Sequence, residues 1–192
     1  YEKAAAQEHA GAPHNLGFLY DHGQGVAQDF TAAREWYEKA AAQEHAGAQV
    51  NLGILHKQGN GVAQDFTAAR EWYENAAAQG DAQAQYNLGV LYKQGQGVAQ
   101  DFTAARAWYE KAAAQEHAAA QVNLGILYDK GQGVAQDFTA AKEWYEKAAA
   151  QGNVGAQHNL GFLYEQGQGV AQDFTAAREW YEKAAAQGNA QA

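Results

Sequence analysis

The sequence predicts an all-α solenoid of antiparallel helix pairs with a period of 36 residues. The main observation is a stretch of nine residues, GVAQDFTAA at 25–33, which returns unchanged at 61–69, 97–105, 133–141 and 169–177. Apolar residues around it recur at the three- and four-residue spacing of a helix face. Short glycine-containing segments separate the helical stretches. Each repeat is therefore one helical unit that buries its apolar face against its neighbours.

The first helix of each repeat is expected at about 11–22 in the first copy. Ala12, Leu16 and Leu19 fall at i, i+4 and i+7, so they share one helix face. Gly17 recurs in every copy although glycine costs about 1 kcal/mol relative to alanine inside a helix. It indicates close packing of a bulky side chain from the second helix. Pro13 is tolerated only in a first turn, which predicts a helix start near residue 11.

The second helix is expected from about 30 to 43, after a loop containing Gly23 and Gly25. Asp29 is the predicted N-cap because its carboxylate can accept hydrogen bonds from amides of the first turn. The apolar stripe comprises Phe30, Ala33, Tyr37 and Ala40, with Trp36 beside it. The helix ends at a glycine in three copies (Gly80, Gly152, Gly188), whereas Glu8, Glu44 and Glu116 predict a weaker terminus elsewhere.

These elements predict a single solenoid domain over residues 1–192. Residues 1–10 are expected to be the back part of a second helix, and 188–192 the start of a further repeat. The helix pairs between them are expected at about 11–43, 47–79, 83–115, 119–151 and 155–187. Because the sequence begins at Tyr1 inside a repeat, the native N-terminus is expected to be missing, and the compartment stays open.

Composition excludes several functional classes. The formal net charge is −9 without a basic cluster, which argues against nucleic acid and against an anionic membrane surface. Cysteine and serine are absent, which excludes thiol and serine nucleophiles. The repeated histidines His9, His45 and His117 would lie about 10 Å apart in packed helices. That spacing is too wide for first-shell ligands at about 2.0–2.1 Å from one ion. No catalytic, metal or cofactor site is therefore expected.

The repeat motif resembles a known family. Leu16-Gly17-x-x-Tyr20, Gly23-x-Gly25-Val26, Asp29 and Ala33-x-x-Trp36-Tyr37-x-x-Ala40-Ala41 are similar to the Sel1-like repeat, a relative of the tetratricopeptide repeat. Ala32 stands where the family often has Lys, and His56 replaces the first-helix Tyr in the second copy. The resemblance implies a right-handed superhelix and an adaptor role in protein complexes, without enzymatic activity. The close similarity of the copies fits either recent duplication or a consensus design.

The candidate binding residues are those that vary within this uniform background. Positions 14, 18 and 21 of the first helix share one face, which lines the concave groove in the tetratricopeptide relatives. An asparagine ladder runs beside it. Together they give the candidate groove His14, Asn15, Phe18, Asp21, Val50, Asn51, Ile54, Lys57, Tyr86, Asn87, Val90, Lys93, Val122, Asn123, Ile126, Asp129, His158, Asn159, Phe162 and Glu165.

Each part of this assignment has an alternative. Positions 14 and 18 can vary because core packing tolerates swaps among apolar groups. The asparagines can bond either an extended peptide or the loop of their own repeat. The Trp row (Trp36, Trp72, Trp108, Trp144, Trp180) is interpreted as packing in preference to a stacking platform. The functional prediction is a non-enzymatic scaffold that binds a peptide or protein segment. The alternative is a structural array that associates head to tail, or a consensus protein without a natural ligand.

Overall fold

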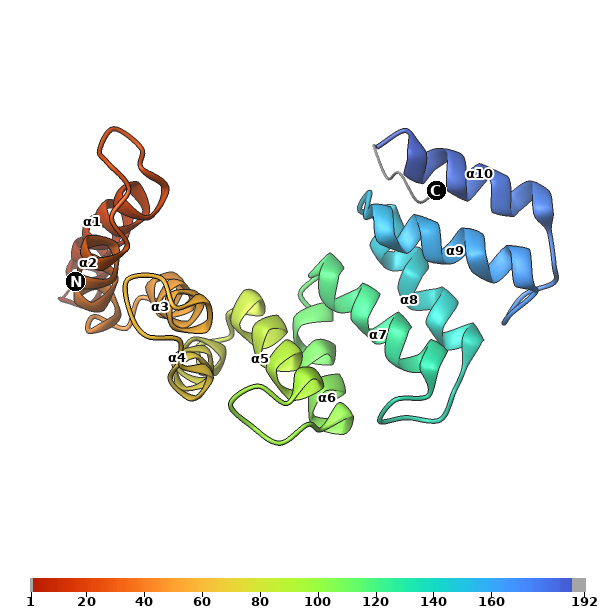
Figure 1. The fold of residues 1–192 in the computed structure, drawn as a ribbon, viewed down its shortest axis with the longest axis horizontal. Helices are drawn as coiled ribbons and strands as arrows, with labels where there is room; N and C mark the ends of the chain where they lie inside the picture. The colour runs from red at the N-terminus through yellow and green to blue at the C-terminus, as the bar shows by residue number, and fades with distance from the viewer. Residues whose placement is uncertain (1, 188–192) are drawn as a thin grey trace. The chain divides into compact units, whose positions relative to one another are not determined.

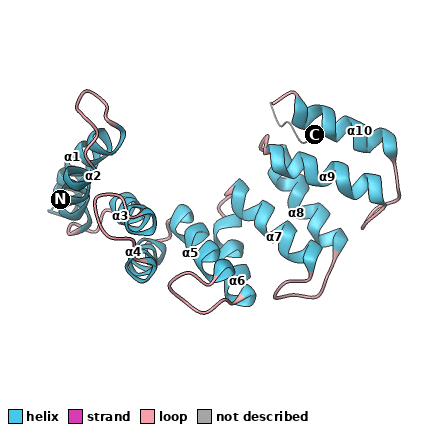
Figure 2. Cartoon of the chain, viewed as in Figure 1, coloured by secondary structure: helices cyan, strands magenta, loops and turns pink. Residues whose placement is uncertain are grey.

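The computed structural model describes residues 2–187, with side chains from residue 10 onward. Over this part of the chain there are ten α-helices and no strand (Figures 1 and 2). The all-α prediction with paired helices is confirmed. The helices are α1 (Glu2–His22), α2 (Phe30–Ala41), α3 (Ala46–Gln58), α4 (Phe66–Ala78), α5 (Ala82–Gln94), α6 (Phe102–Ala113), α7 (Ala118–Lys130), α8 (Phe138–Ala150), α9 (Val154–Gln166) and α10 (Phe174–Ala185).

The helices form two compact units, one over Tyr1–Gln100 and the other over Asp101–Ala192. In the first unit, α1 packs on α2 and α3 on α4, and the contacts α2–α3 and α4–α5 join successive pairs. In the second unit, α7 packs on α8 and α9 on α10, with α6–α7 and α8–α9 as the joining contacts. The same two types of contact thus build both units, as expected for a helical repeat.

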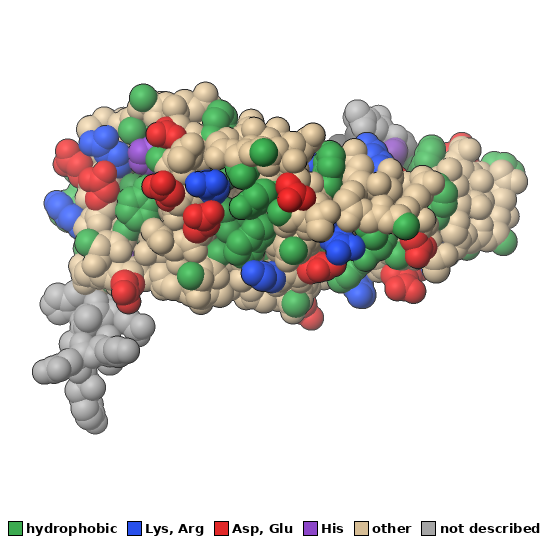
Figure 3. Space-filling view, turned by 90° about the horizontal axis from the view of Figure 1, so that it is seen from below, with side chains coloured by type: hydrophobic (Ala, Val, Ile, Leu, Met, Phe, Trp, Pro, Cys, Tyr) green, Lys and Arg blue, Asp and Glu red, His purple; other side chains and the backbone are tan. Residues whose placement is uncertain are grey.

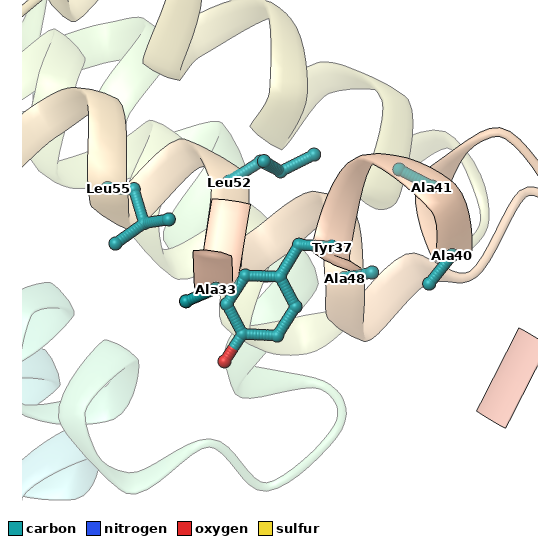
Figure 4. Packing of buried hydrophobic residues seen from close by; sticks show 7 residues of the cluster. All are labelled: Ala33, Tyr37, Ala40, Ala41, Ala48, Leu52 and Leu55. Carbon is teal, nitrogen blue, oxygen red and sulfur yellow. The ribbon is translucent and has the colours of Figure 1, made fainter. Parts of the chain in front are cut away.

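A buried tyrosine lies in the core of each of the first four repeats (Tyr37, Tyr73, Tyr109, Tyr145). Tyr37 is fully buried and lies among small alanines and two leucines in the cluster Ala33, Tyr37, Ala40, Ala41, Ala48, Leu52 and Leu55 (Figure 4). Its ring crosses α1 at Gly17, where an added Cβ would lie 2.5 Å from the ring carbon Cδ1. The prediction that Gly17 accommodates a bulky side chain of the second helix is confirmed.

Side-chain caps begin the second helices. The carboxylate of Asp29 accepts hydrogen bonds from the backbone amides of Thr31 and Ala32, at 2.9 and 3.0 Å. Asp65, Asp101, Asp137 and Asp173 cap α4, α6, α8 and α10 in the same way. The predicted caps are therefore confirmed, and each is worth about 1 kcal/mol of helix stability.

The turn after the second helix requires a left-handed residue. Gly80 and Gly152 supply it at φ 90° and 80°, whereas Glu44 and Glu116 adopt φ 60° and 61°. These two glutamates carry the cost that a Cβ imposes on this conformation, about 1–2 kcal/mol each. The structure thus gives a physical reason for the weaker terminus predicted at these positions. The remaining predicted terminus, Gly188, lies outside the described residues.

The first helix differs from the prediction. α1 runs without a break from Glu2 through Pro13 to His22, whereas the sequence predicted a separate helix that starts near residue 11. A continuous helix spares Glu8 the left-handed conformation that Glu44 and Glu116 adopt. Proline is disfavoured inside a helix because it removes one backbone hydrogen bond. The local signal from Pro13 therefore did not decide where the helix begins.

Candidate functional site

The candidate residues all lie on the first helices α1, α3, α5, α7 and α9, but their exposure differs. Phe18 and Phe162 are 39% and 43% exposed, and Asn15 is also exposed. Val50 and Asn87 are buried, at 6% and 7% exposure. The others are half-buried: His14, Asp21, Asn51, Ile54, Lys57, Tyr86, Val90, Lys93, Val122, Asn123, Ile126, Asp129, His158, Asn159 and Glu165. The face therefore offers partly accessible apolar groups between polar ones.

Two apolar candidates also contribute to packing between repeats. Val122 and Ile126 of α7 pack against the buried cluster that α8 and α9 form around Tyr145. Their variation among apolar residues is thus consistent with tolerance in the core. Phe18 and Phe162 occupy the repeat position of Ile126 but are exposed, at 39% and 43%.

In the first and last repeats, the acidic residue at position 21 bonds the recurring tyrosine of its own repeat. The Tyr37 hydroxyl donates to Asp21 Oδ2 at 3.1 Å, and the Tyr181 hydroxyl donates to Glu165 Oε2 at 2.7 Å. Burial, followed by the bond to Glu165 and its charge, raises the pKa of Tyr181 to about 12. Burial and then Asp21 raise the pKa of Tyr37 further. Both tyrosines therefore stay protonated donors at neutral pH.

One member of the asparagine ladder contacts the preceding repeat. The Asn51 amide lies 3.3 Å from Nε2 of His14 in the preceding repeat. This contact does not go to the loop of its own repeat, which was one of the two expectations. Asn123 instead donates to Ala119 O in its own helix at 2.9 Å.

Sequence reasoning did not identify a cavity of about 540 Å³ in the second unit. Its lining residues are Ala113, Ala114, Glu116, Gln121, Trp144, Lys147, Ala150 and Gln151. The Lys147 ammonium lies 4.0 Å from the centre of the Trp144 ring, and Gln151 donates to Gln121 at 2.8 Å. Three of the polar lining residues, Lys147, Gln121 and Gln151, thus already have partners within the lining. Elsewhere in the Trp row, Trp72 and Trp180 pack against core clusters, as the packing interpretation predicted.

Charged groups of both signs surround the hydrophobic side chains on the face shown in Figure 3. Among the described residues, no group of three or more His, Cys, Asp or Glu side chains is placed to hold a metal ion. Within the same part of the chain, no helix is long and apolar enough to cross a membrane. The first-helix face remains as the candidate site, because apolar and polar side chains recur on it in every repeat.

The protein is a helical-repeat solenoid. Its helices recur in pairs, tyrosine rings of the second helices pack against glycines of the first, and aspartates cap the second helices. The family comparison is specific: the Sel1 repeat model matches residues 12–45, 46–81, 82–117, 118–153 and 154–189. The chain therefore belongs to the Sel1 repeat family. Sel1 repeat proteins are generally scaffolds for protein–protein interaction, and the family is typically non-enzymatic.

Solved structures agree with this assignment. The crystal structure of c5321, a protective antigen of uropathogenic Escherichia coli strains, is 39% identical with a TM-score of 0.90 over 97% of this chain. This chain spans only 40% of the length of that protein. A Sel1 repeat protein from Oxalobacter formigenes is 36% identical with a TM-score of 0.89, over 95% of this chain and 73% of that one. The comparison with curated proteins gives no match.

Proposed function

We propose that the first-helix face of this protein binds an extended peptide or protein segment. The observation that carries the proposal is the contrast between the constant stretch at 25–33 and the variable face. The constant stretch forms the loop, the N-cap and the first turn of the second helix, whereas the variable positions lie on the first-helix face, where all but Val50 are half-buried or exposed. Apolar side chains such as Ile54 and Val90 would bury part of their surface under a ligand, and Lys57 and Lys93 would flank it.

Selection from a random peptide library tests the proposal. We expect selected peptides to bind the wild-type protein and to lose affinity for the double variant Ile54→Glu, Val90→Glu. The matched control is Thr31→Glu, Thr67→Glu, which places the same charges in exposed first turns of second helices. Circular dichroism would verify that both variants keep their helices. Equal binding to both variants would refute the groove assignment.

A second candidate function is head-to-tail association with another copy. Phe174 of α10 is 66% exposed beside a cavity of about 320 Å³ that includes Ala177 and Tyr181. Phe30, at the equivalent position, lies under Gly61, where an added Cβ would be 2.5 Å from the Phe30 carbonyl carbon. A loop of identical sequence from a second copy could cover Phe174 similarly. A mass that stays monomeric by light scattering at high concentration would exclude this function.

A further inference from the structure

Around Tyr73, buried polar atoms lack the hydrogen bonds that Tyr37 makes in the first repeat and Tyr181 in the last. In the first repeat, the Tyr37 hydroxyl donates to Asp21, and the Asn51 amide lies 3.3 Å from His14 Nε2. The corresponding residues are Tyr73 and Lys57 of the second repeat and Asn87 of the third, so lysine replaces the acceptor. The Tyr73 hydroxyl and the Asn87 Nδ2 atom are buried without a hydrogen-bond partner. Both side chains are more than nine-tenths buried, at 0% and 7% exposure.

The position of Tyr73 shows where its missing acceptor belongs. The Tyr73 ring crosses α3 at Gly53, as the Tyr37 ring crosses α1 at Gly17. Its hydroxyl is therefore directed to the place beside residue 57 that corresponds to the Asp21 carboxylate. Burial alone raises the pKa of Tyr73, so no charged group contributes there. Among the described residues, Lys57 forms no side-chain ion pair, and its long side chain can turn toward an incoming anion.

The unpaired groups have one chemical character. A phenol hydroxyl and an amide NH₂ donate hydrogen bonds, and an ammonium both donates and carries positive charge. A buried donor without a hydrogen-bond partner is costly to stability. A charged acceptor makes the strongest hydrogen bonds with such donors. The Asp21 and Glu165 carboxylates already accept from tyrosine at this position of the repeat. The protein thus contains its own examples of the group that fits.

We propose that Tyr73, Asn87 and Lys57 bind one carboxylate of a protein segment that lies on the first-helix face of α3 and α5. This inference rests on the proposed peptide-binding function and adds the chemistry of one ligand group. The carboxylate occupies the place that Asp21 occupies in the first repeat. It belongs to a Glu or Asp side chain or to a free C-terminus, which share this chemistry.

Three capped tripeptides test the inference and separate these sources. Acetyl-Ala-Glu-Ala-amide offers a side-chain carboxylate, acetyl-Ala-Ala-Ala with a free acid offers a terminal one, and acetyl-Ala-Gln-Ala-amide offers neither. Each is titrated at millimolar concentration into ¹⁵N-labelled full chain, and the side-chain amide signals of Asn87 are followed. We expect at least one carboxylate peptide to shift these signals and to bind about tenfold or more tightly than the Gln peptide.

The Lys57→Asp variant supplies the internal acceptor that Asp21 provides in the first repeat. We expect it to abolish the response to the carboxylate peptides while the helices remain intact. Lys39→Asp is the control, since it changes the net charge equally at an exposed site of the same unit. Equal responses to the Glu and Gln peptides would overturn the inference. So would unchanged binding by Lys57→Asp, or tighter binding of inorganic phosphate than of either carboxylate peptide.

The same variants separate this inference from the proposed function. Library-selected peptides that need Ile54 and Val90 but tolerate replacement of every carboxyl group would refute only the carboxylate site. Selected peptides that bind the Ile54→Glu, Val90→Glu variant unchanged would refute the groove. A carboxylate response at Asn87 without any groove-dependent peptide would leave the carboxylate site as the sole ligand site supported on this face.

Discussion

Replacing Gly53 by alanine should destabilise the protein, although alanine is the better helix former. An alanine Cβ at this position would lie 2.6 Å from the Tyr73 ring carbon Cδ1. Tyr73 is fully buried, so its ring cannot move aside without disturbing the core. Overpacking of this kind costs about 1–3 kcal/mol. The gain in helix propensity offsets about 1 kcal/mol of that cost. The net loss in free energy of unfolding is therefore up to about 2 kcal/mol.

Gly155→Ala is the matched control, because the chain itself has alanine at the equivalent position, Ala119. The nearest atom to an added Cβ at Gly155 is Asn153 Oδ1 at 3.4 Å, which is an ordinary contact. This variant should gain about 0.5–1 kcal/mol from helix propensity and lower entropy of the unfolded chain. Urea unfolding followed by circular dichroism measures both changes. Equal effects of the same sign would refute the argument that the tyrosine ring requires glycine.

Two further predictions concern the turns between repeats. His45 Nδ1 accepts the Ala48 amide at 3.1 Å, and burial, followed by the charge on His14, lowers the pKa of His45 from 6.5. Stability should therefore be complete above about pH 6.5 and fall as the pH drops below it. His45→Asn keeps the cap, and urea midpoints between pH 7 and 5 should then depend less on pH; an unchanged slope would contradict this role. Glu44→Gly removes a left-handed glutamate at φ 60° and should stabilise by about 1 kcal/mol. A lower thermal midpoint for this variant would show that the Glu44 side chain matters more than its backbone conformation.

The sequence was sufficient to predict the scaffold because its signals are local. The spacing of Leu16 and Leu19, the capping residue Asp29 and the glycine at 17 each act within one helix or between two consecutive helices. Each of these signals also occurs in five copies of the repeat, which strengthens the prediction. The continuous helix α1 was not predicted because residues 7–12 repeat the sequence of 43–48, where a turn separates two helices. Proline at position 13 disfavours the helix interior, yet it is one contribution among several.

The polar contacts of the face were harder to predict because they join distant residues. The bond from Tyr37 to Asp21 spans 16 residues, and the contact between Asn51 and His14 spans 37. Helix periodicity does not show which of these side chains meet. One signal was available in the sequence: the tyrosine is constant while position 21 changes between acid and lysine. A constant donor beside a variable acceptor indicates a hydrogen bond that some repeats make and others do not.

The binding free energy of a peptide can be divided between the carboxylate site (Lys57, Tyr73, Asn87) and the apolar side chains Ile54 and Val90. Hydrogen bonds to a charged group contribute about 1.5–3 kcal/mol. A micromolar complex requires about 8.2 kcal/mol. One such bond leaves about 5–7 kcal/mol, which corresponds to about 200–270 Å² of apolar surface at 25 cal/mol per Å². Losses of translational and side-chain freedom make the required surface larger. Ile54 and Val90 should thus determine most of the affinity, whereas Lys57, Tyr73 and Asn87 determine the register of the bound segment.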